Sequence, residues 1–196
     1  MSKSFRLFLF LTALIFLAGC ARQIPHMLVN DYGDQRARLV AVLPVESIES
    51  DAGAASLLRA KLIEELHFKG YPEIPPKWID ERLAALTASG GKMDLSPQSL
   101  GKILNVDAIL YTTLNEGQMS VTFLNSRIVV DAEFEMKNAR TGESLWRAHH
   151  RLVHRNYGLS RKSLELKSSQ FYEPAMQEVL IRVLETLPDG PDAVVS

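Results

Sequence analysis

The chain has 196 residues, of which 46% are hydrophobic and 23% charged, and its 22 Lys and Arg residues nearly balance 23 Asp and Glu residues. A chain of this length fits one ordinary domain with short extensions. Because nucleic-acid-binding domains carry a clear basic excess, this balance argues against a nucleic-acid partner.

The first residues have the layout of a secretory signal. Lys3 and Arg6 precede an apolar run, and residues 7–19 contain no charged side chain. The most apolar part, residues 7–17, is only about half as long as the ~20 residues that a membrane-spanning helix needs. We therefore expect a removable signal peptide over residues 1–19.

Cys20 is the only cysteine of the chain. The sequence Leu17-Ala18-Gly19-Cys20 resembles the lipobox of bacterial lipoproteins, in which the cysteine is acylated and becomes the first residue. The resemblance implies a membrane anchor through acyl chains on Cys20. Ala21, where an Asp would signal inner-membrane retention, implies the outer membrane, facing the periplasm, with surface display as an alternative. The competing interpretation, an incidental free thiol, would be a liability in an oxidising compartment.

The region after Cys20 shows no clear period. Residues 20–37 mix Pro, Gly and charged residues, and we interpret them as a lipidated tether. The domain is expected to begin at residue 38, because the apolar run over residues 38–45 predicts a central strand covered on both faces. Pro44 is expected at the end of this strand, since it lacks an amide hydrogen.

Helices and strands are expected to alternate in the first half of the domain. A first helix ends at Gly70, a short strand follows at residues 71–74, a second helix begins at Pro75-Pro76, and a third begins at Ser96. A strand over residues 107–111 completes the order β-α-β-α-α-β.

In the second half of the domain, apolar residues recur at every second position. Residues 128–136 alternate apolar and mostly charged side chains, and a turn joins them to a partner strand at residues 144–149. A strand at residues 118–124 would complete an antiparallel meander. Residues 157–169 are ambiguous, and residues 172–187 predict a closing helix.

The expected fold class is therefore α/β (α+β mixed). A single domain over residues 38–188 contains a mixed β-sheet flanked by helices, and residues 189–196 form a flexible tail.

Histidine supplies the one candidate metal site. His149, His150 and His154 lie close in sequence, but neighbouring residues on a strand point to opposite faces. A zinc site needs more converging ligands than these, so surface histidines are the favoured interpretation. We expect no metal and no cofactor.

Candidate catalytic groups are equally weak. The pairs Glu64-Glu65 and Asp80-Glu81 diverge by about 100° on a helix. Gly90-Gly91-Lys92 lacks the spacing of a phosphate loop. No serine lies in a Gly-x-Ser-x-Gly elbow. We expect no catalytic residue.

Aromatic residues of the predicted strands could be ligand platforms or packing groups. Trp146, Tyr111 and Phe123 are expected in the core or in cross-strand contacts.

Three stretches carry a family resemblance. They read RLVAVLPVES from residue 38, LGKILNVDAILYTTL from residue 100 and NARTGESLW from residue 138. In this order they are similar to an uncharacterised family of bacterial outer-membrane lipoproteins that includes a meningococcal vaccine-candidate lipoprotein. The resemblance implies a fold like those of the TolB amino-terminal domain, the curli-assembly lipoprotein and an outer-membrane lipoprotein that activates a penicillin-binding protein. It implies no activity, cofactor or catalytic residue.

The leading hypothesis is a non-catalytic, lipid-anchored module that binds envelope proteins in outer-membrane or cell-wall assembly or maintenance. The alternatives are a regulator that docks on a peptidoglycan synthase and a subunit of an oligomeric secretion-associated complex. A transmembrane strand needs about 9 to 11 residues, and only residues 128–136 are a convincing candidate. A pore is thus disfavoured, and a homo-oligomer of another kind stays open.

Overall fold

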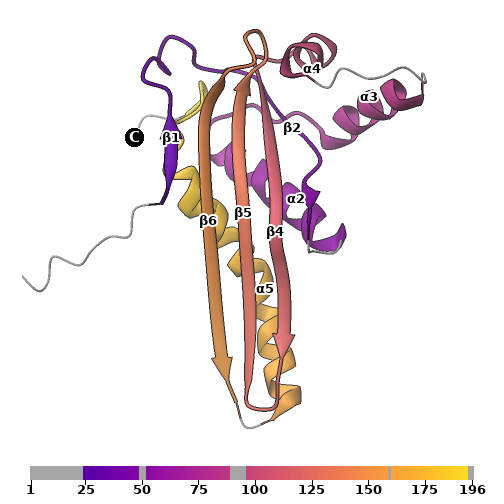
Figure 1. Cartoon of the computed structure of the whole chain (residues 1–196), viewed down its shortest axis with the longest axis vertical. Helices are drawn as coiled ribbons and strands as arrows, with labels where there is room; N and C mark the ends of the chain where they lie inside the picture. The colour runs from indigo at the N-terminus through magenta and orange to yellow at the C-terminus, as the bar shows by residue number, and fades with distance from the viewer. Residues whose placement is uncertain (1–23, 49–51, 89–95, 159, 194–196) are drawn as a thin grey trace, which may run out of the picture.

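The computed structural model describes residues 24–48, 52–88, 96–158 and 160–193 (Figure 1). Within these ranges the chain forms one mixed six-stranded sheet and four helices, which confirms the predicted fold class. The elements, in chain order, are β1 (His26–Leu28), β2 (Val40–Val42), β3 (Glu46–Ser47), α2 (Ala52–Phe68), α3 (Pro76–Ala88), α4 (Pro97–Leu104), β4 (Ala108–Val121), β5 (Asn125–Asn138), β6 (Ser144–Tyr157) and α5 (Arg161–Leu184).

Three strands of 14 residues, β4, β5 and β6, form a long antiparallel ribbon along the length of the molecule (Figure 1). The sheet order is β1-β6-β5-β4-β2, with β3 also on β4. β1 is antiparallel to β6, whereas β2 and β3 are parallel to β4. These short strands accompany only one part of the ribbon. We call the other end, at the β4–β5 turn and the end of β6, the distal end.

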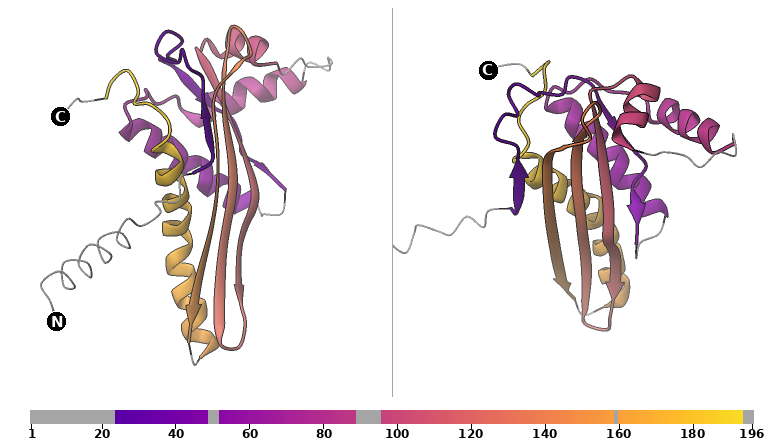
Figure 2. Two further views of the ribbon diagram at one scale, coloured as in Figure 1. Left: turned by 60° about the vertical axis from the view of Figure 1, so that its left-hand side comes forward. Right: turned by 45° about the horizontal axis from the view of Figure 1, so that its top comes forward.

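The helices cover the two faces of the ribbon unequally. α5 runs along one face for its whole length, with α2 beside it (Figure 2). Alternate residues of β5 supply the core on this side, because side chains alternate between the faces of a strand. Phe134 and Met136 pack there with Met176 and Leu180 of α5.

The opposite face is covered only near the β5–β6 turn. There α3 and α4 pack on it through a second cluster that contains Ile79, Leu100, Leu104 and Ile109. Farther toward the distal end, no described helix lies on this face (Figure 2). We call this part the open face.

The folded region extends beyond both predicted boundaries. β1 lies within the expected tether, and Tyr32 and Ala37 are buried in the core. Arg36 donates hydrogen bonds to the carbonyls of Asp189 and Gly190, so the start of the expected flexible tail is packed as well. These contacts join distant parts of the chain and therefore leave no local period. The signal peptide and residues 20–23 lie outside the described residues.

Several predicted elements need correction. β2 is buried but lies at the end of the sheet order and pairs only with β4, so it is not a central strand. Residues 71–74 form no strand. The strands expected at residues 107–111 and 118–124 belong to one strand, β4, which ends at Val121, so residues 122–124 are not part of it. The left-handed stop at Gly70 is confirmed by its φ of 83°.

The closing helix is longer than predicted. α5 begins at Arg161 and continues through Pro174. Of the residues left ambiguous at 157–169, Tyr157 ends β6 and residues 161–169 form the first turns of α5.

Candidate functional site

The predicted histidine cluster is split by the sheet. His149 Nε2 lies 2.8 Å from Asp131 Oδ1, whereas the His154 ring packs against Phe171 of α5, with ring centroids 5.1 Å apart. Among the described residues, no group of three or more His, Cys, Asp or Glu side chains could hold a metal ion. Cys20 and Gly90-Gly91-Lys92 lie outside the described residues.

The acidic pairs of the helices take part in structural contacts. Asp80 accepts from Arg59 at 2.8 Å, Glu64 accepts from Lys61 at 3.2 Å and Glu65 accepts from Gln177. The Arg59 and Gln177 contacts link α2 to α3 and α5, whereas the Lys61 contact lies within α2.

The three aromatic residues divide between packing and exposure. Trp146 is fully buried, and its indole nitrogen donates to Thr186 Oγ1 at 3.0 Å. Tyr111 is half-buried, and Lys137 Nζ lies 5.6 Å from its ring centroid. The expectation for Phe123 is wrong, because it lies in the β4–β5 turn with 81% of its surface exposed.

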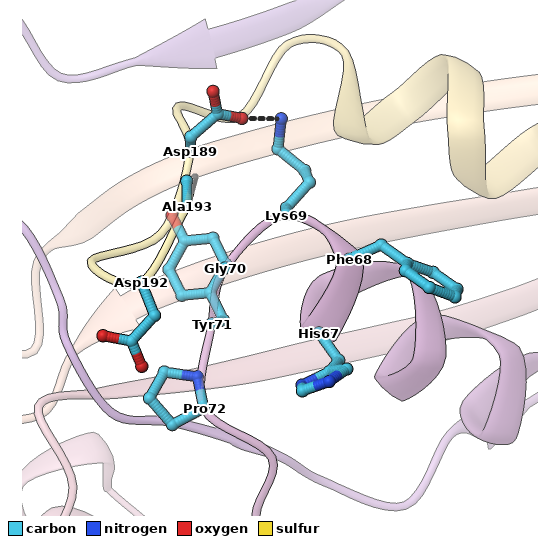
Figure 3. Close-up of a pocket in the computed structure, with 9 residues that line it drawn as sticks. All are labelled: His67, Phe68, Lys69, Gly70, Tyr71, Pro72, Asp189, Asp192 and Ala193. Atoms are coloured by element: carbon cyan, nitrogen blue, oxygen red, sulfur yellow. Dashed lines mark hydrogen bonds and ion pairs between the residues drawn. The ribbon is translucent and has the colours of Figure 1, made fainter. Parts of the chain in front are cut away.

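A pocket of about 460 Å³ lies where α2 meets the C-terminal segment (Figure 3). Lys69 Nζ donates to Asp189 Oδ1 at 2.7 Å across it, and this contact holds the pKa of Asp189 below its ordinary value. Tyr71 donates to the carbonyl of Pro188 at 2.8 Å. Burial raises the pKa of both Tyr71 and Tyr32, so both phenols stay protonated at neutral pH. Polar contacts at the pocket thus join the end of α2 to the C-terminal segment.

Charged side chains form two networks on the face of the ribbon opposite α5. In the first, Arg147 Nη2 lies 2.5 Å from Glu135 Oε1, and Lys137 Nζ lies 3.4 Å from Glu135 Oε2. Partial burial raises the pKa of Glu135, but hydrogen bonds from Arg147 and Ser144 and the charge of Lys137 outweigh it. The pKa therefore lies below its ordinary value.

The second network centres on Arg151. Its guanidinium lies 2.9 Å from Glu116 Oε2 and 3.1 Å from Asp131 Oδ2, and Asp131 also contacts His149. The hydrogen bond that Arg151 donates to Glu116 is the largest cause of the raised pKa of Arg151.

A bulge in β4 places Glu116 in this network. Leu114 pairs with Ala132 and Glu116 with Asp131, so the extra residue, Asn115, has no position of its own in the ladder. An extra residue reverses the alternation of side chains beyond it. Glu116 therefore lies on the open face, although it is two residues from the buried Leu114.

Both outer strands of the ribbon have open edges toward the distal end. β1 pairs with residues 146–148 of β6, and the amide of His149 donates to the carbonyl of Pro25. Beyond His149, no described strand pairs with this edge of β6. On the other side of the ribbon, β2 and β3 pair with residues 108–110 and 113–114 of β4, and no described strand pairs with that edge farther toward the distal end. An unpaired edge can receive a strand from another chain.

A groove of about 830 Å³ lies beside the open edge of β6. Its walls come from residues 24–26, the middle of β6 and α5, and they include Arg151, Glu178 and Arg182. An extended peptide added to β6 would enter this groove. Sequence reasoning missed this site, because it ended the last strand at residue 149 and so gave it no free edge.

The model of the GNA1162-like lipoprotein family matches residues 29–173. The chain belongs to this family. It is 25% identical over 143 residues to the lipoprotein NMB1124/NMB1162 of Neisseria meningitidis serogroup B. That alignment covers 71% of this chain and 66%, just under two thirds, of the Neisseria protein. Family membership assigns the chain to the membrane-anchored proteins of the cell envelope, and the family description names no catalytic activity.

Solved structures resemble this member of the GNA1162-like family. The lipoprotein GNA1162 of Neisseria meningitidis aligns at 22% identity with a TM-score of 0.49, covering 69% of this chain and 95% of that one. A single-residue variant of PelC from Paraburkholderia phytofirmans, solved as a dodecamer, aligns at 14% identity with a TM-score of 0.55, covering 88% of this chain and 99% of that one. The PelC likeness shows a shared fold. In the part of the chain that the structure describes, none of the helices has the length and apolar character needed to cross a bilayer.

Proposed function

We propose that Cys20 carries acyl chains and holds the domain on the outer membrane, facing the periplasm, after removal of residues 1–19. The observation that carries this proposal is the agreement of two separate parts of the chain. The lipobox-like sequence ends at Cys20, whereas the match to a lipoprotein family begins only at residue 29. Two or more acyl chains are enough for stable attachment to a bilayer.

The anchored domain then acts as a non-catalytic module that binds another envelope protein in outer-membrane or cell-wall assembly or maintenance. The edge of β6 and the groove beside it support this role, because main-chain hydrogen bonds and side-chain contacts would act together on one bound strand. The charges of Glu178 and Arg182, which line this groove from α5, favour a partner segment that is itself polar.

The anchor is tested by Cys20→Ala in the native host. Wild-type protein is expected to incorporate labelled palmitate and to fractionate with the outer membrane, and the variant to lose both properties. Ala21→Ser, which leaves the cysteine in place, is the matched control and should still be labelled. A Cys20→Ala protein that keeps its label would contradict the proposal.

The partner site is tested by photo-crosslinking in living cells. A photoreactive residue at Val153, on the open edge of β6, is expected to capture a defined envelope protein. The same residue at Glu81, on the exposed side of α3, serves as control. If both positions capture the same proteins in the same amounts, the β6 edge is not the binding site.

A second candidate, a homo-oligomer, is favoured by the two open edges of the same ribbon. Toward the distal end the β6 strand carries Arg155, which has no acidic partner in the described contacts, while β4 has no basic side chain. Pairing β6 of one copy with β4 of the next would be a head-to-tail contact, which closes into a ring when the rotation allows. PelC, which shares the fold, is a dodecamer. Light scattering should give a multiple of the monomer mass, and a monomer at all concentrations would exclude this candidate.

A further inference from the structure

Apolar side chains are concentrated at the distal end. Phe123, Leu124 and Tyr157 are 81%, 53% and 71% exposed. They lie together, because Asn125 pairs with Tyr157 and Gly158 donates to the carbonyl of Leu124 at 3.1 Å. Neighbouring exposed apolar residues, unlike scattered ones, indicate a contact surface.

The same end is rich in basic side chains, one of which, Arg161, pairs at 2.9 Å with Glu165 one turn farther along α5. The segments that form it, residues 117–130 and 152–164, contain no Asp or Glu but hold Arg127, Arg155, Arg161 and Lys162. This composition differs from that of the whole chain, whose charges nearly balance.

Arg127 and Arg155 have no compensating acidic partner in the described contacts. They are directly opposite each other on β5 and β6, a placement that is unfavourable for like charges. Arg127 Nε is buried and makes no hydrogen bond to any described residue. By contrast, Arg147 and Arg151, which share β6 with Arg155, are paired with carboxylates. The two distal arginines therefore favour an anion from outside the chain.

We propose that the distal end is a second, non-covalent membrane contact. Phe123, Leu124 and Tyr157 enter the interface of an anionic phospholipid bilayer, and Arg127 and Arg155 bind lipid phosphates. Aromatic and aliphatic side chains are stable at the headgroup level, where long basic side chains reach the phosphates. The inference rests on the proposed anchor only for the choice of bilayer, which is the one that holds Cys20.

The length of the anchor segment fits this arrangement. Ile24 lies at the level of His150, so Tyr157 is seven residues, or about 24 Å, farther along β6. The four residues from Cys20 to Ile24 span at most about 14 Å. Along the direction of β6, Cys20 can thus come within about 10 Å of the distal end. Interfacial elements sink about 5–10 Å into the headgroup region, so one bilayer can take both contacts.

The test is vesicle flotation of the mature chain with Cys20→Ser, which has no acyl chains. Binding is expected to vesicles of equal parts phosphatidylglycerol and phosphatidylcholine, to weaken with salt, and to be absent with phosphatidylcholine alone. Phe123→Ser with Tyr157→Ser should weaken binding about tenfold or more, since apolar burial of one aromatic side chain accounts for at least that factor. Arg127→Gln with Arg155→Gln should remove the preference for anionic vesicles.

Matched controls lie at the other end of the molecule. Phe68→Ser changes an aromatic residue that is 73% exposed, and Arg140→Gln changes an exposed cation in the β5–β6 turn. Neither should change binding. Absence of binding to anionic vesicles, equal binding to both vesicle types, or an equal loss in the controls would overturn the proposal. The proposal would also be overturned if Phe123→Ser dissociated oligomers of the protein without changing vesicle binding, because a second copy would then cover the distal end.

These outcomes are separable from those of the anchor experiment. Loss of palmitate labelling depends on Cys20 alone, whereas flotation uses unacylated protein. Vesicle binding by a protein that is never acylated in cells would support the distal contact and reject the anchor.

Discussion

The hydroxyl of Tyr32 lies 2.9 Å from the hydroxyl of Tyr71. Because Tyr71 donates its own proton to the carbonyl of Pro188, Tyr32 is the donor to Tyr71. This chain of two hydrogen bonds ties the N-terminal segment to the end of α2 and to the residues after α5. The beginning and the end of the domain therefore stabilise each other.

The two tyrosines should contribute unequally to stability. Tyr71→Phe removes both hydrogen bonds and leaves the Tyr32 hydroxyl without an acceptor, so we expect a loss of about 2 kcal/mol in the free energy of unfolding, against about 1 kcal/mol for Tyr32→Phe. Urea denaturation measures both, and Tyr157→Phe, at an exposed hydroxyl, is the control. A larger effect for Tyr32→Phe than for Tyr71→Phe would contradict the assigned direction of donation.

A close backbone contact leaves no room for a side chain at Gly190. Its amide donates to the carbonyl of Lys69 at 2.7 Å, and a Cβ here would overlap the backbone of Gly70. Gly190→Ala must separate the two segments and should lower the free energy of unfolding by about 1–3 kcal/mol. Gly33→Ala, where a Cβ meets no atom within 4 Å, should be close to neutral in the same urea titration. Equal stability of the two variants would show that the C-terminal segment is not docked in solution.

These contacts explain which parts of the fold were predictable. The apolar alternation of β5 and the leucine spacing of α2 are local signals that report a buried face, and both elements were predicted. The packing of residues 24–37 depends on partners far away in the sequence, such as Tyr71 for Tyr32 and Asp189 for Arg36, and such contacts leave no periodicity. The start of α5 was not predicted because residues 157–169 are polar and show no clear apolar period, although the helix begins at Arg161 and continues through Pro174.

The candidate site was less predictable than the fold. The lipobox-like sequence around Cys20 is a linear motif and can be found without a structure. The open edge of β6 could not be found from the sequence, because its polar residues, among them His149 and Arg151, obscure the strand period. Phe123 was assigned to packing because strand periodicity cannot distinguish a buried strand position from the turn beyond it.

The Glu135 network predicts a specific dependence of stability on pH. Because the pKa of Glu135 is lower in the folded state, its contribution is complete above the ordinary pKa of a carboxyl and is lost as the pH falls through the folded-state pKa. Glu135→Gln should therefore lower the free energy of unfolding by about 1 kcal/mol near neutral pH and have almost no effect in acid. Urea titrations at both pH values measure the difference. Glu133→Gln is the control, since the bond that Glu133 accepts from Asn115 is longer, at 3.4 Å. A difference that is independent of pH would exclude ionised Glu135 as its cause.

The bulge in β4 predicts that one residue of the sheet can be deleted. Removing Asn115 leaves Leu114 opposite Ala132 and Glu116 opposite Asp131, so every side chain keeps its face. The loss should be about 1 kcal/mol, from the hydrogen bonds of Asn115 to Asp131 and Glu133. Removing Thr113 instead moves Leu114 to the open face and puts Asn115 in the fully buried position that Leu114 occupied. This should lower the free energy of unfolding by about 3 kcal/mol or more. Thermal unfolding of the two deletion variants compares them directly. If they are equally stable, the bulge does not set which face Glu116 occupies.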